Sequence, residues 1–295
     1  MNEKIHPADR ISPVSSQATY TYTNTANSVD DLEKLEILPQ ILQEGILFAG
    51  SGAALLLQAA FPGIKATFEE SNIKTGNNTT YLANNLSDTL QSALSYIACL
   101  VFGTTEEKKR LLDLLQKDQS PFQRKKLPSD PLTQLWITAT VYATATDFYQ
   151  RIYGRVDFRT AEKAYAEFTT VLSCLNIAKD AWPPTRQSFW EYWDSQIERL
   201  NVSAESHRVA KTLLEKNDFP GWVNVMKPLL RAITIEMLPP QLRDAYGLKS
   251  SAKTRGLYRG AMGFSVAVYP ALPASMRGYP LRFYLGDLRG QLGKT

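Results

Sequence analysis

Three long segments of this chain contain no charged residue. They cover residues 45–64, 89–105 and 131–146. A helix without a polar face must be buried on every side, so the three segments predict central helices inside an all-α fold with an apolar interior. The first segment is nearly long enough to span a membrane, but its glycines, its glutamine and its Pro-Gly end favour burial in protein.

Amphipathic helices are predicted around these segments, because apolar residues recur there at helical spacing and no run alternates as a strand would. Two of these helices begin at Thr105 and at Pro239. The others cover Thr160–Leu175, Ser188–Leu200, Ser203–Leu214, 255–268 and Leu281–Leu288. Residues 1–30 are rich in Ser, Thr and Asn and predict a flexible arm. Residues 31–295 then form a single helical domain.

The charge balance argues against a nucleic-acid partner. The 33 Lys and Arg residues exceed the 29 Asp and Glu residues by four, and no dense basic run is present to follow a phosphate backbone. The chain starts without the apolar stretch of a signal peptide. Cys99 and Cys174 both stand in apolar surroundings, which favours reduced, buried thiols and a cytoplasmic protein. Peripheral membrane contact is left open, and the sequence does not indicate an oligomeric state.

The common catalytic motifs are absent from the sequence. It has no glycine-rich dinucleotide or phosphate loop, no nucleophile elbow and no HExxH pair. Its only histidines are His6, in the predicted arm, and His207, on a charged and therefore solvent-facing helix. A Ser-His-Asp triad or a multi-histidine metal site is close to excluded, and no metal site is expected.

Polar side chains inside the charge-free segments are the remaining candidates, because a buried polar group needs a partner or serves a ligand. Gln58 is one. Others follow a single helical face in the third segment and beyond it: Trp136, Thr140, Thr144, Asp147 and Arg151. Two interpretations stay open for this stripe: a hydrogen-bonded seam between helices with Asp147 paired to Arg151, or the polar wall of an apolar pocket.

An aromatic cluster allows two interpretations as well, core packing or a cage for a ligand, and packing is the commoner outcome. Its members are Trp182, Phe189, Trp190, Tyr192 and Trp193.

Five motifs in order resemble the rubber-oxygenase catalytic-domain family, which includes the latex-clearing protein and the membrane-bound oxygenase of the mycophenolic acid pathway. They are AGSGAALLLQAAFPGI, LSYIACLVFGTTEE, DPLTQLWITAT, FWEYWDSQI and LPPQLRDAYGL, and the similarity covers about residues 35 to 290. The resemblance implies a globin-like helical bundle. In active oxygenases it also implies a b-type haem that cleaves prenyl chains with oxygen.

This sequence departs from the family pattern where that pattern has histidine or arginine. Phe61 replaces the histidine of a His-Pro-Gly motif, and Thr138 replaces that of a Trp-Val-His motif. Thr89 and Ala93 stand where the family has an Arg and a Thr. The segment expected to hold the haem-ligating histidine has Gln119 as its nearest counterpart. Haem iron needs an axial His, Cys, Met or Tyr, so only a thiolate from Cys99 stays open as an unusual ligand.

The resemblance and its departures leave three functions open. The first is a haem-free enzyme of natural-product metabolism that folds a hydrophobic polyketide or terpenoid for a cyclisation, pericyclic reaction or isomerisation. The others are a haem-dependent oxygenase with atypical ligation and a non-catalytic binder of hydrophobic molecules. For the first function the candidate catalytic residues are Gln58, Thr138 and Asp147, the candidate pocket residues are Phe61, Ala93, Trp136, Thr140 and Thr144, and no cofactor is expected.

Overall fold

The computed structural model describes residues 25–62, 64, 81–117, 130–175, 181–215 and 221–293. Every regular element in these residues is a helix, which confirms the all-α prediction. The globin-like arrangement stays a prediction. In chain order the elements are α1 (Thr25–Leu32), α2 (Ile37–Leu42), the 3-10 helix η1 (Gly45–Gly50), α3 (Ser51–Ala59), α5 (Tyr81–Phe102), α6 (Thr105–Gln116), α7 (Pro131–Tyr153), α8 (Phe158–Cys174), α9 (Arg186–Arg199), α10 (Ala204–Glu215), α11 (Gly221–Met237), α12 (Pro240–Ala245), α13 (Ala252–Val268), the 3-10 helix η2 (Tyr269–Ala271), α14 (Ala274–Arg277) and α15 (Tyr279–Leu292).

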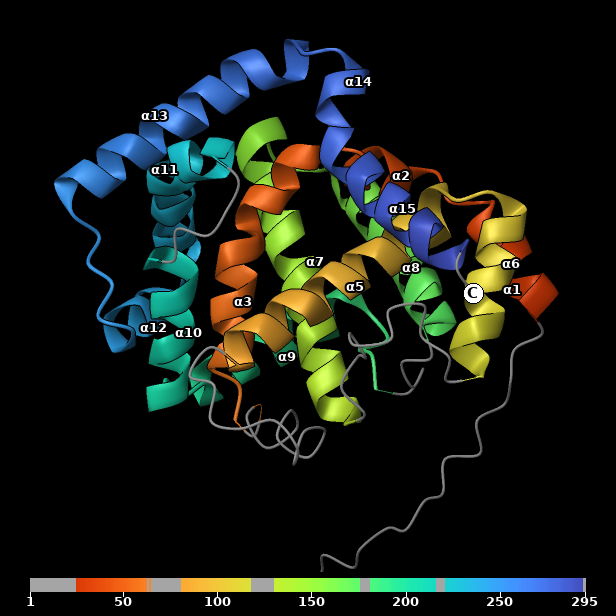
Figure 1. Cartoon of the computed structure of the whole chain (residues 1–295), viewed down its shortest axis with the longest axis horizontal. Coiled ribbons are helices and arrows are strands. Elements are labelled where there is room, and N and C mark those ends of the chain that lie inside the picture. Colours follow the sequence, from red (N-terminus) through yellow and green to blue (C-terminus); the bar gives the residue numbers. More distant parts are fainter. Residues whose placement is uncertain are drawn as a thin grey trace, which may run out of the picture.

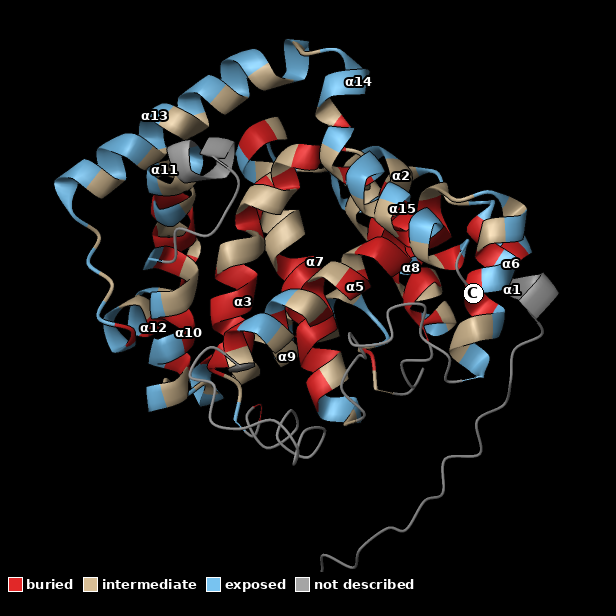
Figure 2. Ribbon diagram, viewed as in Figure 1, coloured by how far each residue is buried: buried red, intermediate tan, exposed pale blue. Residues whose placement is uncertain are grey.

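The charge-free segments supply the centre of the fold. α3, α5 and α7 cross in the middle of the molecule, and most of their residues are buried (Figures 1 and 2). α3 is buried continuously from Ala53 to Ala60. Gly52 lets α3 approach α11 closely, because a Cβ at this position would lie 2.2 Å from the hydroxyl oxygen of Thr234. The glycines that weaken a membrane span therefore serve helix packing.

Local signals explain where the longest central helix begins and ends. The carboxylate of Asp130 accepts a hydrogen bond from the backbone amide of Thr133, and Pro131 occupies the first helical position, where no amide is needed. α7 then runs to Tyr153 and ends at Gly154, whose φ of 86° is accessible to glycine at little cost. The uninterrupted helix places Trp136 and Arg151 on one rigid element.

The other helices cover this centre. α15 packs along α5, α10 and α11 pack against α3, and α2 packs against α8. α13 lies over α11 and α7 as a long outer helix and has no buried residue (Figures 1 and 2). The residues described therefore enclose one large apolar cluster beside a smaller one around Phe148.

The predicted helices agree with α6, α8, α9, α10, α12, α13 and α15 to within a few residues. The first charge-free segment differs, because its N-terminal part forms the 3-10 helix η1 and the α-helix α3 begins at Ser51. Four α-helices in the described residues, α1, α2, α11 and α14, were not predicted. α11 contains Pro228, a residue that ordinarily ends or kinks a helix.

The N-terminal helix starts before the expected end of the flexible arm. α1 begins at Thr25, and Val29 is buried in the apolar cluster. Residues 1–24, which include His6, lie outside the described residues. The single domain over residues 31–295 stays a prediction. In the described part of the chain, no helix combines the length and apolarity that a membrane crossing requires.

Candidate functional site

An apolar cavity lies between the central helices and α2, η1, α8 and α15. It holds about 860 Å³ of empty space, counting the part that is open to solvent. Only Ser51, Tyr142, Thr144 and Thr146 bring hydroxyl groups to its wall. The other described lining residues are Leu38, Ile41, Leu42, Leu47, Phe48, Ala54, Leu90, Leu94, Ile97, Val141, Ala145, Ala164, Phe168 and Leu281.

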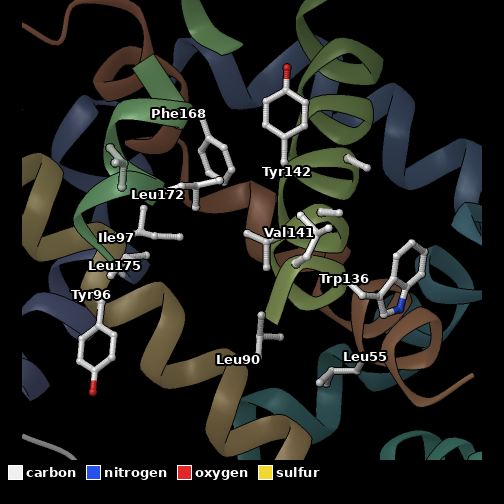
Figure 3. Packing of buried hydrophobic residues seen from close by; sticks show 14 of the residues in the cluster. Leu55, Leu90, Tyr96, Ile97, Trp136, Val141, Tyr142, Phe168, Leu172 and Leu175 are labelled. Carbon is white, nitrogen blue, oxygen red and sulfur yellow. The ribbon is translucent and has the colours of Figure 1, made fainter. Parts of the chain in front are cut away.

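The close-up view shows how side chains from three helices face one another across this region. Val141 projects from α7 toward Ile97 of α5, with Phe168 of α8 beside them (Figure 3). Trp136 lies on the opposite side of α7 (Figure 3). One face of α7 therefore borders the cavity, and another face packs into solid core.

A buried carboxylate holds the short helix that forms one wall of the cavity. Glu167 of α8 accepts hydrogen bonds from the backbone amides of Glu36, Ile37 and Leu38, at 3.1, 2.9 and 2.7 Å. These amides open α2 and have no partner within that helix. Glu167 thereby fixes α2, whose Leu38 and Ile41 line the cavity.

Tyr142 is the most enclosed polar group of the cavity wall. Burial raises the pKa of its phenol to about 12, so the hydroxyl keeps its proton at neutral pH. The neighbouring hydroxyl of Thr146 offsets part of this rise in the pKa. The ring of Tyr142 contacts Phe168 and Phe189 at centroid separations of 5.1 and 4.9 Å. Tyr142 is thus a fixed, neutral hydrogen-bond donor beside an apolar space.

The predicted polar stripe on α7 faces away from the cavity over most of its length. The side-chain amide of Gln58 donates a hydrogen bond of 2.8 Å to the Thr140 hydroxyl, and both side chains are fully buried. The indole of Trp136 donates to the backbone carbonyl of Leu57 at 3.2 Å. These contacts join α3 to α7 and match the interpretation of the stripe as an interhelical seam.

The C-terminal end of the stripe lies at the surface. The guanidinium Nε of Arg151 donates to the carboxylate of Asp147 at 2.8 Å, and one terminal nitrogen donates to the hydroxyl of Tyr258 on α13 at 2.8 Å. The Asp147 side chain is 45% exposed. This pair attaches α13 to α7.

The other candidate residues have packing contacts. Phe61 stacks on Trp136 at 5.7 Å, and Trp136 stacks on Trp193 at 5.3 Å. Ala93 is buried on α5. The hydroxyls of Thr138 and Thr144 donate to the carbonyls of Gln134 and Thr140, four residues earlier, at 2.8 and 2.6 Å, so their protons are already used. Of the eight candidates, only Thr144 is among the described residues that line the cavity. The catalytic and binding roles of all eight stay predictions.

The aromatic cluster packs as core rather than as an open cage. Tyr142 stands at its centre and contacts Trp182, Phe189 and Trp190, while Trp193 extends the stack to Trp136. Trp182 and Phe189 are buried.

The described lining residues of the cavity do not fit a haem. His207 is exposed, with its ring against Tyr246, and the sequence holds no other histidine except His6. No His, Cys or Met is among the described lining residues of the cavity, and the phenol of Tyr142 is held protonated. In the described part of the chain, no three His, Cys, Asp or Glu side chains gather as a metal site would require. Gln119 lies outside the described residues.

A thiolate ligand from Cys99 does not fit either. Its side chain is fully buried in the apolar cluster, and burial raises the pKa of the thiol to about 12. Cys174 is half-buried, where a buried thiol was predicted, and neither cysteine forms a disulfide.

Comparison with known proteins places the chain in a family. Residues 38–267 match the family described as the ER-bound oxygenase mpaB/B′ and rubber oxygenase catalytic domain. The chain belongs to this oxygenase family, which confirms the resemblance.

Two curated relatives match most of the chain. They are uncharacterized proteins of Mycobacterium tuberculosis and Mycobacterium bovis, each 25% identical over 246 residues, which is 80% of this chain and 94% of the relative. No solved structure matches at a significant level.

Sequence reasoning missed two residues that shape the cavity. Tyr142 lies inside the third charge-free segment. Its phenol is a buried polar group that needs a partner, and this signal could have identified it. Glu167 is a lone acid on the apolar side of α8, where a charged residue predicts a specific partner. The amides that it binds are more than a hundred positions away, so no local pattern indicated them.

Proposed function

We propose that this chain is a haem-free member of its oxygenase family that binds a hydrophobic small molecule in the cavity and converts it without oxidation. The reaction would be a cyclisation, a pericyclic reaction or an isomerisation of a terpenoid- or polyketide-type compound. The single observation that carries the proposal is an apolar cavity between the central helices whose described wall holds no residue suited to ligate haem iron.

Such reactions depend on the shape of the binding site and on one or two well-placed hydrogen bonds more than on a cofactor. A preformed apolar cavity restricts a flexible chain to conformations near the reactive one. The neutral hydroxyl of Tyr142 is placed to donate to a substrate carbonyl, and a donor in such a dry site stabilises charge more strongly than it would in water. Thr144 retains lone pairs that accept hydrogen bonds. We therefore assign the polarising role to Tyr142 ahead of Gln58, Thr138 and Asp147, which do not line the described wall.

An absorption spectrum of the purified full-length protein tests the haem-free half of the proposal. We expect no Soret band and no stoichiometric iron, including after growth with a haem precursor. A Soret band with one iron per chain overturns this half and leaves the alternative of an oxygenase with atypical ligation.

Binding is tested with all-trans-farnesol, an acyclic prenyl alcohol, by titration calorimetry. Ala145→Phe fills part of the cavity from α7, and Ala267→Phe makes the same change on the exposed face of α13. Excluding about two ligand methylenes weakens binding about tenfold, at roughly 0.8 kcal/mol each. We expect this loss for Ala145→Phe and none for Ala267→Phe. Equal affinities in all three proteins overturn the assignment of the cavity.

Conversion is tested with all-trans-farnesal under argon and in the presence of a chelator. Cyclisation or isomerisation leaves the mass of the compound unchanged, whereas oxygenation adds the mass of one or two oxygen atoms. We expect an isomeric product that Tyr142→Phe reduces about a hundredfold, the scale of losing one hydrogen-bond donor to a developing charge. An oxygenated product that requires air contradicts the proposal. Binding without any product assigns the chain as a carrier of this class of compound.

A further inference from the structure

A second hollow adjoins the cavity and differs from it in chemistry. This outer hollow has about 740 Å³ of empty space, again counting the part open to solvent. It shares Ile41, Tyr142, Thr146 and Ala164 with the cavity. The two spaces therefore share one wall, to which Tyr142 contributes.

The outer hollow is more polar than the cavity. Gln150 and Tyr149 of α7 and Arg186 at the start of α9 line it, together with Trp190. Arg186 is the only basic residue among the described lining residues of either space. A ligand that occupies both spaces would meet hydrocarbon at one end and a guanidinium at the other.

The guanidinium of Arg186 is oriented and has donors to spare. Its Nε donates to the carboxylate of Glu162 at 2.7 Å, and its central carbon lies 5.5 Å from the ring centroid of Phe158. Its side chain is 27% exposed. Its two terminal nitrogens have no hydrogen-bond partner among the described residues, and a guanidinium offers four N–H donors there.

We propose that the cavity and the outer hollow together bind one amphiphilic ligand, an apolar chain that ends in a carboxylate. The carboxylate binds the terminal nitrogens of Arg186, and the chain passes Tyr142 and Thr146 into the cavity. Two parallel N–H donors match a carboxylate in geometry as well as in charge. Glu162 is a positioning residue, because it holds the guanidinium without lining either space. The proposal rests on the proposed function and adds the substrate class.

A matched pair of ligands separates the two proposals. Dodecanoate and dodecan-1-ol share an apolar chain and differ in the head group, and both are titrated into the full-length protein at pH 8. We expect dodecanoate to bind about tenfold more tightly, the scale of a hydrogen bond to a charged group. Equal affinities overturn the carboxylate site and leave the proposed function standing. Failure of both ligands to bind counts against the proposed function itself.

Variants at the ion pair identify the group that supplies the preference. Arg186→Gln should weaken dodecanoate binding about tenfold and leave the affinity for dodecan-1-ol unchanged. Arg186→Lys should have an intermediate affinity for dodecanoate, because it keeps the positive charge and lacks the paired N–H donors of the guanidinium. Glu162→Gln keeps an oxygen that can accept the hydrogen bond from the guanidinium but removes the competing negative charge, so it should strengthen dodecanoate binding by a few fold. If the ion pair only stabilises the fold, Arg186→Gln and Glu162→Gln weaken both ligands alike, and that result overturns the proposal. Thermal unfolding of each variant confirms that it is folded.

Discussion

The side-chain amide of Gln58 donates a hydrogen bond to the hydroxyl of Thr140, and the two residues are 82 positions apart in the chain. Thr140 completes the arrangement by donating its own proton to the carbonyl of Ile137 at 2.6 Å. Both side chains are fully buried between α3 and α7. The bond therefore connects two central helices in a region from which solvent is excluded.

The first prediction is that this pair stabilises the fold cooperatively. Gln58→Leu and Thr140→Val should each cost about 1–3 kcal/mol, because each leaves a buried polar partner unsatisfied. The double variant should cost less than the sum, with a coupling of about 1 kcal/mol. Denaturant unfolding measures all four proteins. Additive losses would show that the two side chains do not depend on one another.

The second prediction concerns the wall of the cavity. Glu167→Gln removes the charge that three amides at the start of α2 share, and should lower the free energy of unfolding by about 1–3 kcal/mol. Hydrogen exchange should accelerate at Ile37 and Leu38 more than in α7. Glu198→Gln, on the exposed side of α9, is the matched control and should change neither quantity. Uniform acceleration across the chain would mean that Glu167 supports the whole fold rather than α2.

The third prediction is a difference in thiol reactivity. Because burial raises the pKa of Cys99 to about 12, its thiol should resist iodoacetamide in the folded protein up to pH 10. Cys174 is half-buried and should react first. Mass spectrometry of the alkylated peptides measures the order, and both sites should react in denaturant. Rapid labelling of Cys99 in the folded protein would revive it as a candidate thiolate ligand.

The helical class of this fold was predictable from the sequence, and the site was not. Three charge-free segments require helices buried on every side, and such helices form the centre of the structure. Periodicity also placed Trp136, Thr140 and Asp147 correctly on one face of α7. Periodicity does not reveal which other helices a given face of α7 contacts. The cavity borders the face that carries Val141 and Ala145, whose side chains give no polar signal.

Contacts between residues that are far apart in the sequence determine the rest of the site. Glu167 stands on the apolar side of α8 without a partner nearby in the sequence, and Arg186 precedes the predicted helix Ser188–Leu200, where a charged residue is typical of a solvent-facing position. Their roles depend on α2 and on the end of α7, which approach them only in the folded chain. The departures from the family motif were informative in a different way. They predict a loss of the haem ligands, which stays a prediction, and Phe61 and Thr138 have packing and backbone contacts rather than positions in the described wall.

The last prediction is a pH-dependent contribution from Glu107 at the start of α6. Its carboxylate accepts hydrogen bonds from Arg289 of α15 at 2.6 and 3.1 Å and from the backbone amide of Thr104 at 2.9 Å. Thr104 in turn caps the backbone amide of Glu107. The ion pair with Arg289 and the hydrogen bond from Thr104 hold the pKa of Glu107 below its usual range.

A lowered pKa in the folded state means that the unfolded chain binds the proton more readily. The stabilisation is therefore complete above about pH 5 and is lost as the pH falls below about 4, toward the lowered pKa of the folded state. Glu107→Gln should cost about 1 kcal/mol at pH 7, the scale of a capping box and a largely solvated ion pair, and almost nothing at pH 3. Glu106→Gln, one position earlier and exposed, should cost less at pH 7 because it lacks the contact with Arg289. Unfolding curves at both pH values measure the free energy of unfolding of each variant. An equal loss of this free energy at pH 3 and pH 7 would assign the effect to the amide substitution itself rather than to the charge.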